Sequence, residues 1–539
     1  MSRRLLLGGL AAATPVVALS MQGPDSPLSA YNDAAAMRAL RLWTQLGPVI
    51  ARYRYVELKH KLVTLPKDER NKEWESLDAV HSHTVLDTLQ GLRGFYIKVG
   101  QLMAHRNDVL SMAYIEKLRG LEDRVPPLMN GDQARQVVKT SLGLESLEDV
   151  FADFQDEPLV GQVHKATLKS TGKPVAIKIQ SPGAEALFRK DIQTARNFCR
   201  IFIPEQVILF DEIEKQFISE FDYTIEAKHL NTMHQNMTPE YGNLVVVPRS
   251  FPQLCSREVL TMEFLKGKKL VDGVREMGRE WCARNGTTLE AYEREMREKY
   301  EREGLPPVYQ GPGARVLDMY RSYVQVSDWV VNVPRVVYNW SVGWVLPNSW
   351  LVPYHKSFVP LNTARIMDTL LKVHGKQVLI DGFLNGDPHP GNFLLLEDGR
   401  LGMLDMGQIK ILTREERLFM ARLYKALVNE DRTELKRLSI EGGYVSKYND
   451  PEVMFRMARV GFDQDGRQVT DGLNLQQFVD KMYKQDPWEK TLDALVMPMR
   501  VSLLIRGVGL MLHHPVSVAQ AWKPIAEKAL KEAEIEERS

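Results

Sequence analysis

Two polar loops, close together in the chain, constrain this sequence more than any other feature. The first loop has the sequence GDPHPGN (residues 386–392) and the second has the sequence LDMG (residues 404–407). Asn392 comes five residues after Asp387, and Asp405 comes thirteen residues after Asn392. Phosphoryl-transfer folds use this spacing to bring a catalytic loop and a metal-binding loop together, because Mg²⁺ takes carboxylate and amide oxygens beside the phosphates. The two loops therefore predict a phosphoryl-transfer site.

Length, composition and charge exclude several classes of protein. The 539 residues exceed one ordinary core, and 44% apolar with 26% charged residues is globular composition. A formal net charge of +1 supplies no basic field, so nucleic acid is not an expected partner. Cys199, Cys255 and Cys282 show no CxxC spacing, which favours reduced structural thiols over a disulfide framework or a zinc site.

The first residues resemble a targeting segment, which we bound at residues 1–30. Arg3 and Arg4 precede an apolar run over residues 5–20, and no acidic residue occurs before Asp25. The run is too short to span a bilayer comfortably. An organelle presequence and a secretory signal both fit this pattern.

Residues 31–135 are predicted to form an N-terminal helical extension. Apolar residues recur there at helical spacing, and Lys98 and Gln101 would share one helix face. A solvated polar face is the plainer interpretation of this pair when it is taken alone.

The hydrophobic period then changes from helix to strand, over a region that we bound at 136–270. Residues 159–166 and 174–179 predict two strands joined at Gly172. Lys178 follows Val-Ala-Ile, where a strand lysine can neutralise nucleotide phosphates, and Glu226 on a later helical pattern is its expected ion-pair partner. A surface lysine and a solvated helix are the alternatives. A further strand over 258–264 ends in Glu263, Phe264 and Leu265, the candidate adenine-binding hinge.

Residues 271–362 are predicted to be an insertion. The part over residues 276–303 is rich in Arg and Glu at helical spacing, and the later part is aromatic from Tyr323 to Tyr354. Pro334 and Arg335 argue against a membrane-spanning helix. Two interpretations remain, of which we favour the first: a subdomain packed on its own core, or a surface for a membrane interface or a partner groove.

Residues 363–530 are predicted to be helical, followed by a charged tail over 531–539. The apolar run over 492–512 contains Arg500 and Arg506. We therefore expect a buried or membrane-facing amphipathic helix rather than a span.

Five motifs occur in the order seen in the UbiB/AarF-like atypical kinases, and the chain resembles that family from about residue 92 to about residue 416. They are Lys98-Val99-Gly100-Gln101, Val175-Ala176-Ile177-Lys178, Glu220-Phe221-Asp222, the run GDPHPGN at 386–392 and Asp405-Met406-Gly407. The resemblance implies an α+β, bilobal protein-kinase-like fold with this helical extension and insertion. It also implies a link to isoprenoid-quinone biosynthesis or lipid homeostasis.

The resemblance further implies roles for single residues, with ATP or ADP and Mg²⁺ as cofactors. Lys178 would contact the α and β phosphates and Glu226 would orient it, Asp387 would be the catalytic base, and Asn392 with Asp405 would hold Mg²⁺.

Four further residues complete the implied site; the resemblance assigns them to the family's own extension, which would lie across the entry of a protein substrate. This arrangement favours ATP hydrolysis or a small or lipid-bound substrate over protein phosphorylation. The four residues are Lys98, Gln101, Glu220 and Asp222.

Three departures from the family separate two functional classes. The phosphate loop before Gly161 is shorter by about four residues, which removes amide groups that could hold phosphates. Asn385-Gly386 replaces His-Ala, Met406 replaces Phe, and the 271–362 insertion is long. An active Mg²⁺-dependent kinase or ATPase is the first hypothesis, and a non-catalytic lipid- or partner-binding scaffold is the second. Asp387 with His389 as a transition-metal site is a weaker third one.

Partners and location follow from the same resemblance. We expect membrane lipids or prenylquinone-pathway proteins as partners, with peripheral membrane association and no nucleic acid. A mitochondrial location is expected, with a plastid as the alternative and secretion less favoured.

Overall fold

The computed structural model describes residues 29–63, 66–103, 111–121, 129–159, 162–202, 214, 217–304, 308–343, 350–473, 475–490 and 495–538. The chain forms two compact units. Unit 1 comprises Met1–Lys228 with Ser250–Phe264, and unit 2 comprises His229–Arg249 with Leu265–Ser539. The targeting segment predicted over residues 1–30 lies, except for its last two residues, outside the described residues.

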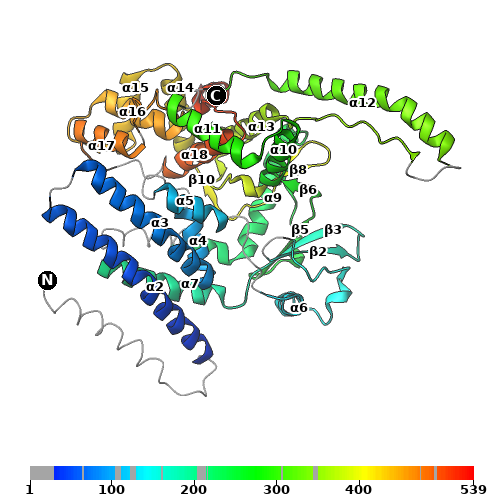
Figure 1. Ribbon diagram of the computed structural model, residues 1–539, viewed down its shortest axis with the longest axis horizontal. Helices are drawn as coiled ribbons and strands as arrows, with labels where there is room; N and C mark the ends of the chain where they lie inside the picture. The colour runs from blue at the N-terminus through cyan, green and yellow to red at the C-terminus, as the bar shows by residue number, and fades with distance from the viewer. Residues whose placement is uncertain are drawn as a thin grey trace. The chain divides into compact units, whose positions relative to one another are not determined.

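Unit 1 begins with a group of helices, as the sequence predicts for the extension (Figure 1). Their shared core contains aromatic rings such as Phe95 and Phe188, whose centroids lie 5.3 Å apart edge to face. The helical segments of unit 1 are α2 (Ser29–Leu62), α3 (Lys67–Leu92), α4 (Phe95–Met103), α5 (Met112–Leu118), η1 (Arg119–Leu121), α6 (Gly131–Ser141), η2 (Leu147–Asp149), α7 (Ala184–Phe202), η4 (Ser219–Phe221) and η5 (Pro252–Leu254).

Unit 1 also contains an antiparallel sheet in the order β1-β2-β3-β5. Its strands are β1 (Phe151–Ala152), β2 (Val163–Leu168), β3 (Pro174–Ile179) and β5 (Val259–Glu263). Strand β2 begins at Val163, four residues after the predicted start. The alternating residues Val175, Ile177 and Ile179 of β3 pack with α6 in one buried core. Side chains at the positions between them therefore face away from α6.

Helix α9 (Tyr223–Tyr241) carries the chain from unit 1 into unit 2. The sequence interpretation assigned everything from 136 to 270 to one lobe, and this assignment is corrected for residues 229–249. The reason is strand pairing, since β4 (Val245–Val246) pairs in parallel with β9 (Leu401–Met403) of unit 2. A parallel pair between such distant segments has no local sequence signal.

Unit 2 contains a second four-stranded sheet and two small ribbons. The sheet has the order β4-β9-β8-β6, where β6 is Gly267–Lys269 and β8 is Phe393–Leu396. One ribbon pairs β7 (Phe383–Asn385) with β10 (Ile409–Ile411), and the other pairs β11 (Val445–Ser446) with β12 (Trp488–Lys490). Both polar loops of the sequence are bounded by these strands.

Helices make up most of unit 2. They are α10 (Leu270–Arg284), α11 (Leu289–Glu303), α12 (Ala314–Val342), α13 (Thr363–Lys376) with a π-helical turn η7 (Gln377–Asp381), η8 (Pro390–Asn392), α14 (Arg414–Val428), α15 (Arg432–Glu441), α16 (Pro451–Phe462), α17 (Leu475–Gln485), α18 (Val496–Met511) and α19 (Val518–Arg538). Thr413 and Glu416 form a capping box that starts α14. The fully buried Trp522 of α19 donates to the Leu371 carbonyl at 2.8 Å.

Two sequence predictions about unit 2 are corrected. Residues 531–538, which the sequence interpretation set apart as a charged tail, are the last turns of α19, and Ala533 among them is buried. The interpretation of the insertion as a subdomain packed on its own core does not hold for α12, which exposes large apolar side chains along its length. Pro334 lies inside α12 without ending it. Among the described residues, no helix is both long and apolar enough to cross a membrane.

Candidate functional site

The ion pair expected between Lys178 and Glu226 forms within unit 1. Lys178 Nζ lies 3.0 Å from Glu226 Oε1 and 2.9 Å from Oε2. The Glu226 side chain is 5% exposed and that of Lys178 is 24% exposed. Lys178 Nζ also lies 5.0 Å from the centre of the Tyr223 ring. We call this pair the cation half of the candidate site.

The sequence of β3 explains why the lysine is held. Lys178 is paired on both sides, with Val163 of β2 and Leu260 of β5, so its backbone lies in the middle of the sheet. Because Ile177 and Ile179 face the buried core with α6, Lys178 faces the opposite side, where α9 supplies Glu226. A central strand and a helix therefore fix the position of the cation.

The helical extension contacts this region through Lys98. Its Nζ lies 3.0 Å from Glu220 Oε2, so the predicted residues Lys98 and Glu220 meet within unit 1. Gly100 permits α4 to pack closely against Leu121, because a Cβ at residue 100 would lie 2.4 Å from Leu121 Cδ1. Gln101 lies in α4, but its side chain is outside the described part of the chain.

Asp222 has a local structural role. Its Oδ1 accepts hydrogen bonds from the Thr224 amide at 2.9 Å and from Thr224 Oγ1 at 2.6 Å, which caps the first turn of α9. The cofactor role that the resemblance implies for Asp222 stays a prediction.

The predicted hinge coincides with a passage of the chain between units. Glu263 ends β5, and the Phe264 amide donates to the Pro174 carbonyl at 3.2 Å. Unit 1 ends at Phe264 and unit 2 resumes at Leu265. The shortened phosphate loop is partly outside the described residues, at positions 160 and 161.

The predicted catalytic loop lies in unit 2 and is fixed by hydrogen bonds to its backbone. The His389 amide donates to the Asp387 carbonyl at 2.7 Å, and Asn392 Nδ2 donates to the same carbonyl at 3.1 Å. Asn392 Nδ2 is also 3.4 Å from Asp387 Oδ2. The amide nitrogen of Asn392 therefore faces Asp387, which leaves its Oδ1 as the atom suited to a metal. Asp387, Asn392 and Asp405 form the acid half of the candidate site.

Strands β8 and β9 bring the two loops of the acid half together. The two strands pair antiparallel, and the Leu404 amide donates to the Asn392 carbonyl at 3.0 Å. Asp405 is the next residue, and its Oδ1 accepts from the Gly407 amide at 2.8 Å. The amide oxygen of Asn392 and the carboxylate of Asp405 are donors that suit Mg²⁺ when phosphate oxygens help to complete the shell.

Three residues of this region differ from the family pattern, and each of them makes a contact in the structure. Asn385 Nδ2 donates to the Asp405 carbonyl at 3.0 Å, so Asn385 links the two loops. A Cβ on residue 386 would lie 2.5 Å from Met497 Sδ, so Gly386 permits the close approach of α18. Met406 is fully buried, and its carbonyl accepts from His229 Nδ1 at 3.1 Å. Burial lowers the pKa of His229.

Arg500 is a site residue that the sequence interpretation missed. Its Nη2 lies 3.3 Å from Asp387 Oδ1, and both side chains are about one third exposed or less. The available signal was an arginine within the apolar run over 492–512. The apolar face of α18 is buried, so the membrane-facing alternative for this helix is not needed.

A transition-metal role for His389 has little geometric support. His389 Nδ1 accepts a hydrogen bond from the Gly391 amide at 3.1 Å, which occupies one of its two ring nitrogens. Among the residues that the structure describes, no group of three His, Cys, Asp or Glu residues could hold a metal ion.

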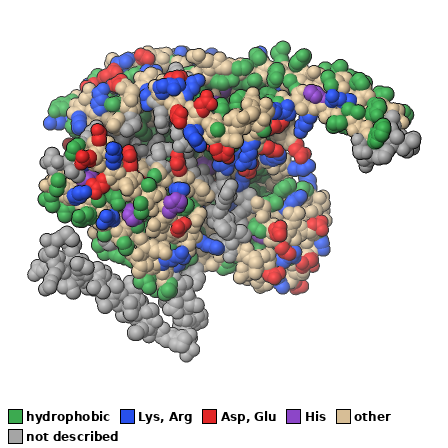
Figure 2. Space-filling model, viewed as in Figure 1, with side chains coloured by type: hydrophobic (Ala, Val, Ile, Leu, Met, Phe, Trp, Pro, Cys, Tyr) green, Lys and Arg blue, Asp and Glu red, His purple; other side chains and the backbone are tan. Residues whose placement is uncertain are grey.

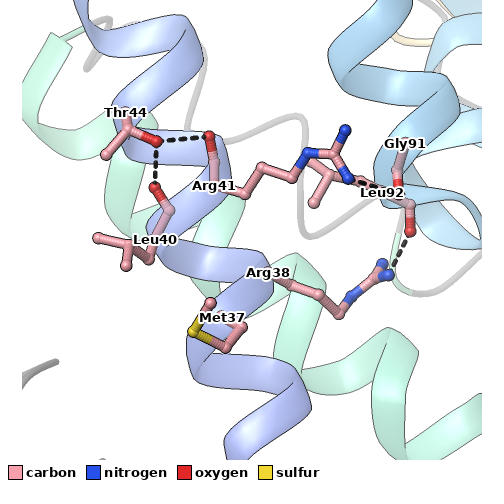
Figure 3. A pocket seen from close by; sticks show the side chains of 7 residues that line it. All are labelled: Met37, Arg38, Leu40, Arg41, Thr44, Gly91 and Leu92. Carbon is pink, nitrogen blue, oxygen red and sulfur yellow. Dashed lines mark hydrogen bonds between the residues drawn. The ribbon is translucent and has the colours of Figure 1, made fainter.

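A hollow of about 460 Å³ lies elsewhere in unit 1, where α2 faces the end of α3 (Figure 3). It contains none of the predicted site residues. Arg38 pairs with Asp191 and donates to the Leu92 carbonyl, while Arg41 donates to the Gly91 carbonyl at 3.2 Å. These bonds join α2 to α3 and α7, so we interpret the hollow as a packing feature.

Known proteins are similar to this chain over much of its length. A Shewanella woodyi protein named "Probable protein kinase UbiB" is 24% identical over 478 residues, which are 84% of this chain and 71% of that protein. The Arabidopsis thaliana protein "ACTIVITY OF BC1 COMPLEX KINASE 1, chloroplastic" is 24% identical over 367 residues. That match covers 66% of this chain and 42% of the relative, so the chain spans less than half of its length.

A solved structure and a family model complete the comparison. A Mycobacterium tuberculosis protein, solved in complex with erythromycin, is 19% identical with a TM-score of 0.46, over 85% of this chain and 97% of that one. The model of the ABC1 atypical kinase-like domain matches residues 120–290 and 314–439, more than half of the chain. Both halves of the candidate site lie within these matched ranges. The chain is therefore a member of the ABC1 atypical kinase-like family, with an α+β kinase-like fold.

Proposed function

We propose that this protein is a Mg²⁺-dependent atypical kinase or ATPase of the UbiB type. The observation that carries the proposal is the Lys178–Glu226 pair, in which the buried carboxylate lies 2.9 Å from Nζ of the half-buried lysine. Burying two charges is costly unless they are paired, and a strand lysine oriented in this way is what phosphate binding requires. The acid half supplies the complementary donor set for Mg²⁺ in the same chain.

The residues then have separate tasks. Bound Mg-nucleotide would supply the transferable phosphoryl group. Lys178 would neutralise the α and β phosphates, with Glu226 holding its ammonium in place. Asn392 and Asp405 would hold the metal. Asp387 would accept the proton of the attacking water or hydroxyl, while Arg500 keeps its carboxylate oriented through Oδ1.

Phosphate release from ATP tests this proposal. The native chain should release phosphate only with Mg²⁺, and Asp387→Asn should lower the rate by on the order of a hundredfold or more. Asp398→Asn is the matched control, since Asp398 is an exposed acid on the β8–β9 turn that pairs with Arg400. The control should retain the native rate.

The scaffold hypothesis predicts a different result. If ATP with Mg²⁺ neither raises the melting temperature of the native chain nor yields phosphate, the enzyme proposal fails and a non-catalytic lipid- or partner-binding role replaces it.

We also propose that the activity supports isoprenoid-quinone biosynthesis or lipid homeostasis at an organelle membrane. The support is the resemblance to UbiB and to a relative named as chloroplastic. Prenylquinone and lipid contents of cells that carry the native chain or Asp387→Asn in its place test the role. Equal contents would contradict it. Imaging residues 1–50 fused to a fluorescent protein would distinguish mitochondrion, plastid and secretion.

A further inference from the structure

Helix α12 turns its polar side inward. It is accompanied by the segment over residues 351–362, which runs back along it within unit 2 (Figure 1). Asn339 exchanges hydrogen bonds with the Val352 backbone at 2.8 and 2.9 Å, and Asn332 bonds the backbone of His355 in the same manner. The polar side chains of the helix therefore hold the returning segment.

The two acids of α12 are used for the same purpose. Asp328 accepts from the amide and Oγ of Ser357 at 2.8 and 2.6 Å, which lowers its pKa. Asp318 accepts from Asn362 Nδ2 at 2.7 Å and pairs with Arg365. At 100° per residue the four polar residues lie on one side of the helix.

Apolar and aromatic side chains of α12 point to solvent. Six of them are between 60% and 72% exposed, namely Met319, Tyr323, Val326, Trp329, Val337 and Trp340. With their neighbours they cover roughly 200° of the helix circumference. Figure 2 shows hydrophobic side chains along the visible surface of α12. An amphipathic helix on the surface of a water-soluble protein has the opposite orientation, with its apolar face buried. This reversal predicts an apolar environment for the outer side of α12.

The charges of α12 and the returning segment indicate what kind of surface covers the apolar side. We define the α12 arm as residues 314–360, which contain four Lys or Arg and two Asp. Both Asp residues are engaged inside the arm or with Arg365, as described above. Within the described residues, Arg315 and Arg321 have no carboxylate partner. The arm therefore combines an outer side of apolar and aromatic side chains with surplus positive charge, and at 100° per residue Arg315 lies on that outer side and Arg321 on the polar side.

We propose that the α12 arm is a membrane-docking element that lies in the interface of a bilayer containing anionic lipids. Its 29-residue helix would extend over about 43 Å. Trp and Tyr favour the level of the lipid headgroups, and the cations complement lipid phosphates. The Asp and Asn side chains of α12 already have hydrogen-bond partners in the returning segment. Only the apolar side of the helix therefore has to enter the lipid.

Two other occupants fit less well. A second copy of the chain would bring two arms of the same net positive charge together in an isologous contact, where like charges repel. A helix that binds a protein groove presents an apolar stripe of about 100°, which is much narrower than this one. A flat, anionic and apolar surface fits both the width and the charge.

Vesicle flotation of the full-length chain tests the proposal. The vesicles are phosphatidylcholine alone, and phosphatidylcholine mixed with phosphatidylglycerol. The native chain should float with the mixed vesicles, and the double variant Trp329→Ser with Trp340→Ser should lose at least about tenfold in partitioning. Tyr448→Ser with Ile535→Ser is the control, since these residues are 60% and 58% exposed on other elements. It should float as the native chain does.

A charge variant separates the two contributions. Arg315→Gln with Arg321→Gln should weaken binding to mixed vesicles by roughly tenfold and leave binding to phosphatidylcholine unchanged. Each variant should retain the native circular dichroism and melting temperature. If the native chain stays unbound with mixed vesicles, or if the Trp variant floats equally well, the proposal is wrong. A native dimer that the Trp variant converts to a monomer, without flotation of either, would assign the surface to a second copy.

The docking proposal and the proposed function share only the membrane location, so different results would contradict each of them. Asp387→Asn should float as the native chain does, and the Trp variant should release phosphate at the native rate. Flotation without phosphate release contradicts the enzyme proposal alone. Phosphate release without flotation contradicts the docking proposal alone.

Discussion

The cation half and the acid half of the candidate site are held in different ways. Lys178 and Glu226 are side chains of a central strand and a helix, and the half-buried ammonium and the buried carboxylate neutralise each other. Asp387 and Asp405 lie in loops that are held by hydrogen bonds to their backbones, while the Asp387 carboxylate lies 3.3 Å from Arg500 Nη2 of α18 and 3.4 Å from Asn392 Nδ2. Substitutions in the cation half should therefore affect both the stability and the activity of the protein. Changes in the acid half should affect function first.

Glu226→Gln should have the largest effect, because it leaves the Lys178 ammonium partly buried without its partner. We expect a loss of about 2–3 kcal/mol in the free energy of unfolding and of on the order of a hundredfold in ATP turnover. Chemical denaturation and phosphate release measure these quantities. The control is Glu148→Gln, which removes an exposed pair with Arg135 in the same unit. Equal stability of the two variants would contradict the distinction between the halves.

Arg500→Gln should mainly lower turnover. Loss of the contact with Asp387 Oδ1 leaves the proposed base less well oriented, which we expect to cost about tenfold to a hundredfold in rate. The melting temperature should change little, and Arg500→Lys should restore part of the rate. Arg432→Gln, at an exposed pair with Glu452, is the matched control. An unchanged rate in Arg500→Gln would show that Asp387 does not need this partner.

Gly100→Ala tests how much the cation half depends on the helical extension. The new methyl group would lie 2.4 Å from Leu121 Cδ1, so we expect a loss of about 2 kcal/mol in stability. Gly120→Ala is the control, since nothing lies within 4 Å of its Cβ position. Thermal unfolding compares the two. Equal melting temperatures would indicate that α4 adjusts without cost.

Acidification should lower the folding stability of the chain through His374. This residue is fully buried in α13, its ring lies 6.1 Å from that of Phe393, and burial lowers its pKa to about 4. The unfolded chain binds the proton more readily, so stability is lost as pH falls below the ordinary histidine pKa. We expect a loss of about 1 kcal/mol from this group between about pH 7 and about pH 5.5. His374→Leu should flatten that part of the unfolding profile, and an equally steep profile in the variant would remove His374 as the cause.

The sequence predicted the motif-bearing parts of the fold better than the long apolar helices. Order and spacing were enough for the strand lysine, its glutamate partner and the two polar loops, because short motifs depend on local geometry. The runs that became α12 and α18 are both apolar with interrupting arginines. In α18 the apolar side is buried and Arg500 meets Asp387, whereas in α12 the polar side is half-buried against the returning segment. Hydrophobic periodicity in the sequence shows that a helix has an apolar and a polar face. Which face is covered depends on the segment that packs along the helix.

The Mg²⁺ dependence of nucleotide affinity tests the central claim most directly, which is that Lys178 and Asp405 have different roles in binding Mg-nucleotide. The quantity is the ratio of the ADP dissociation constants without and with Mg²⁺, measured by calorimetry. In Lys178→Met both constants should rise by a similar factor, so the ratio stays near that of the native chain. In Asp405→Asn the ratio should fall to about one, because the metal ligand is lost. A native ratio in Asp405→Asn would contradict the account.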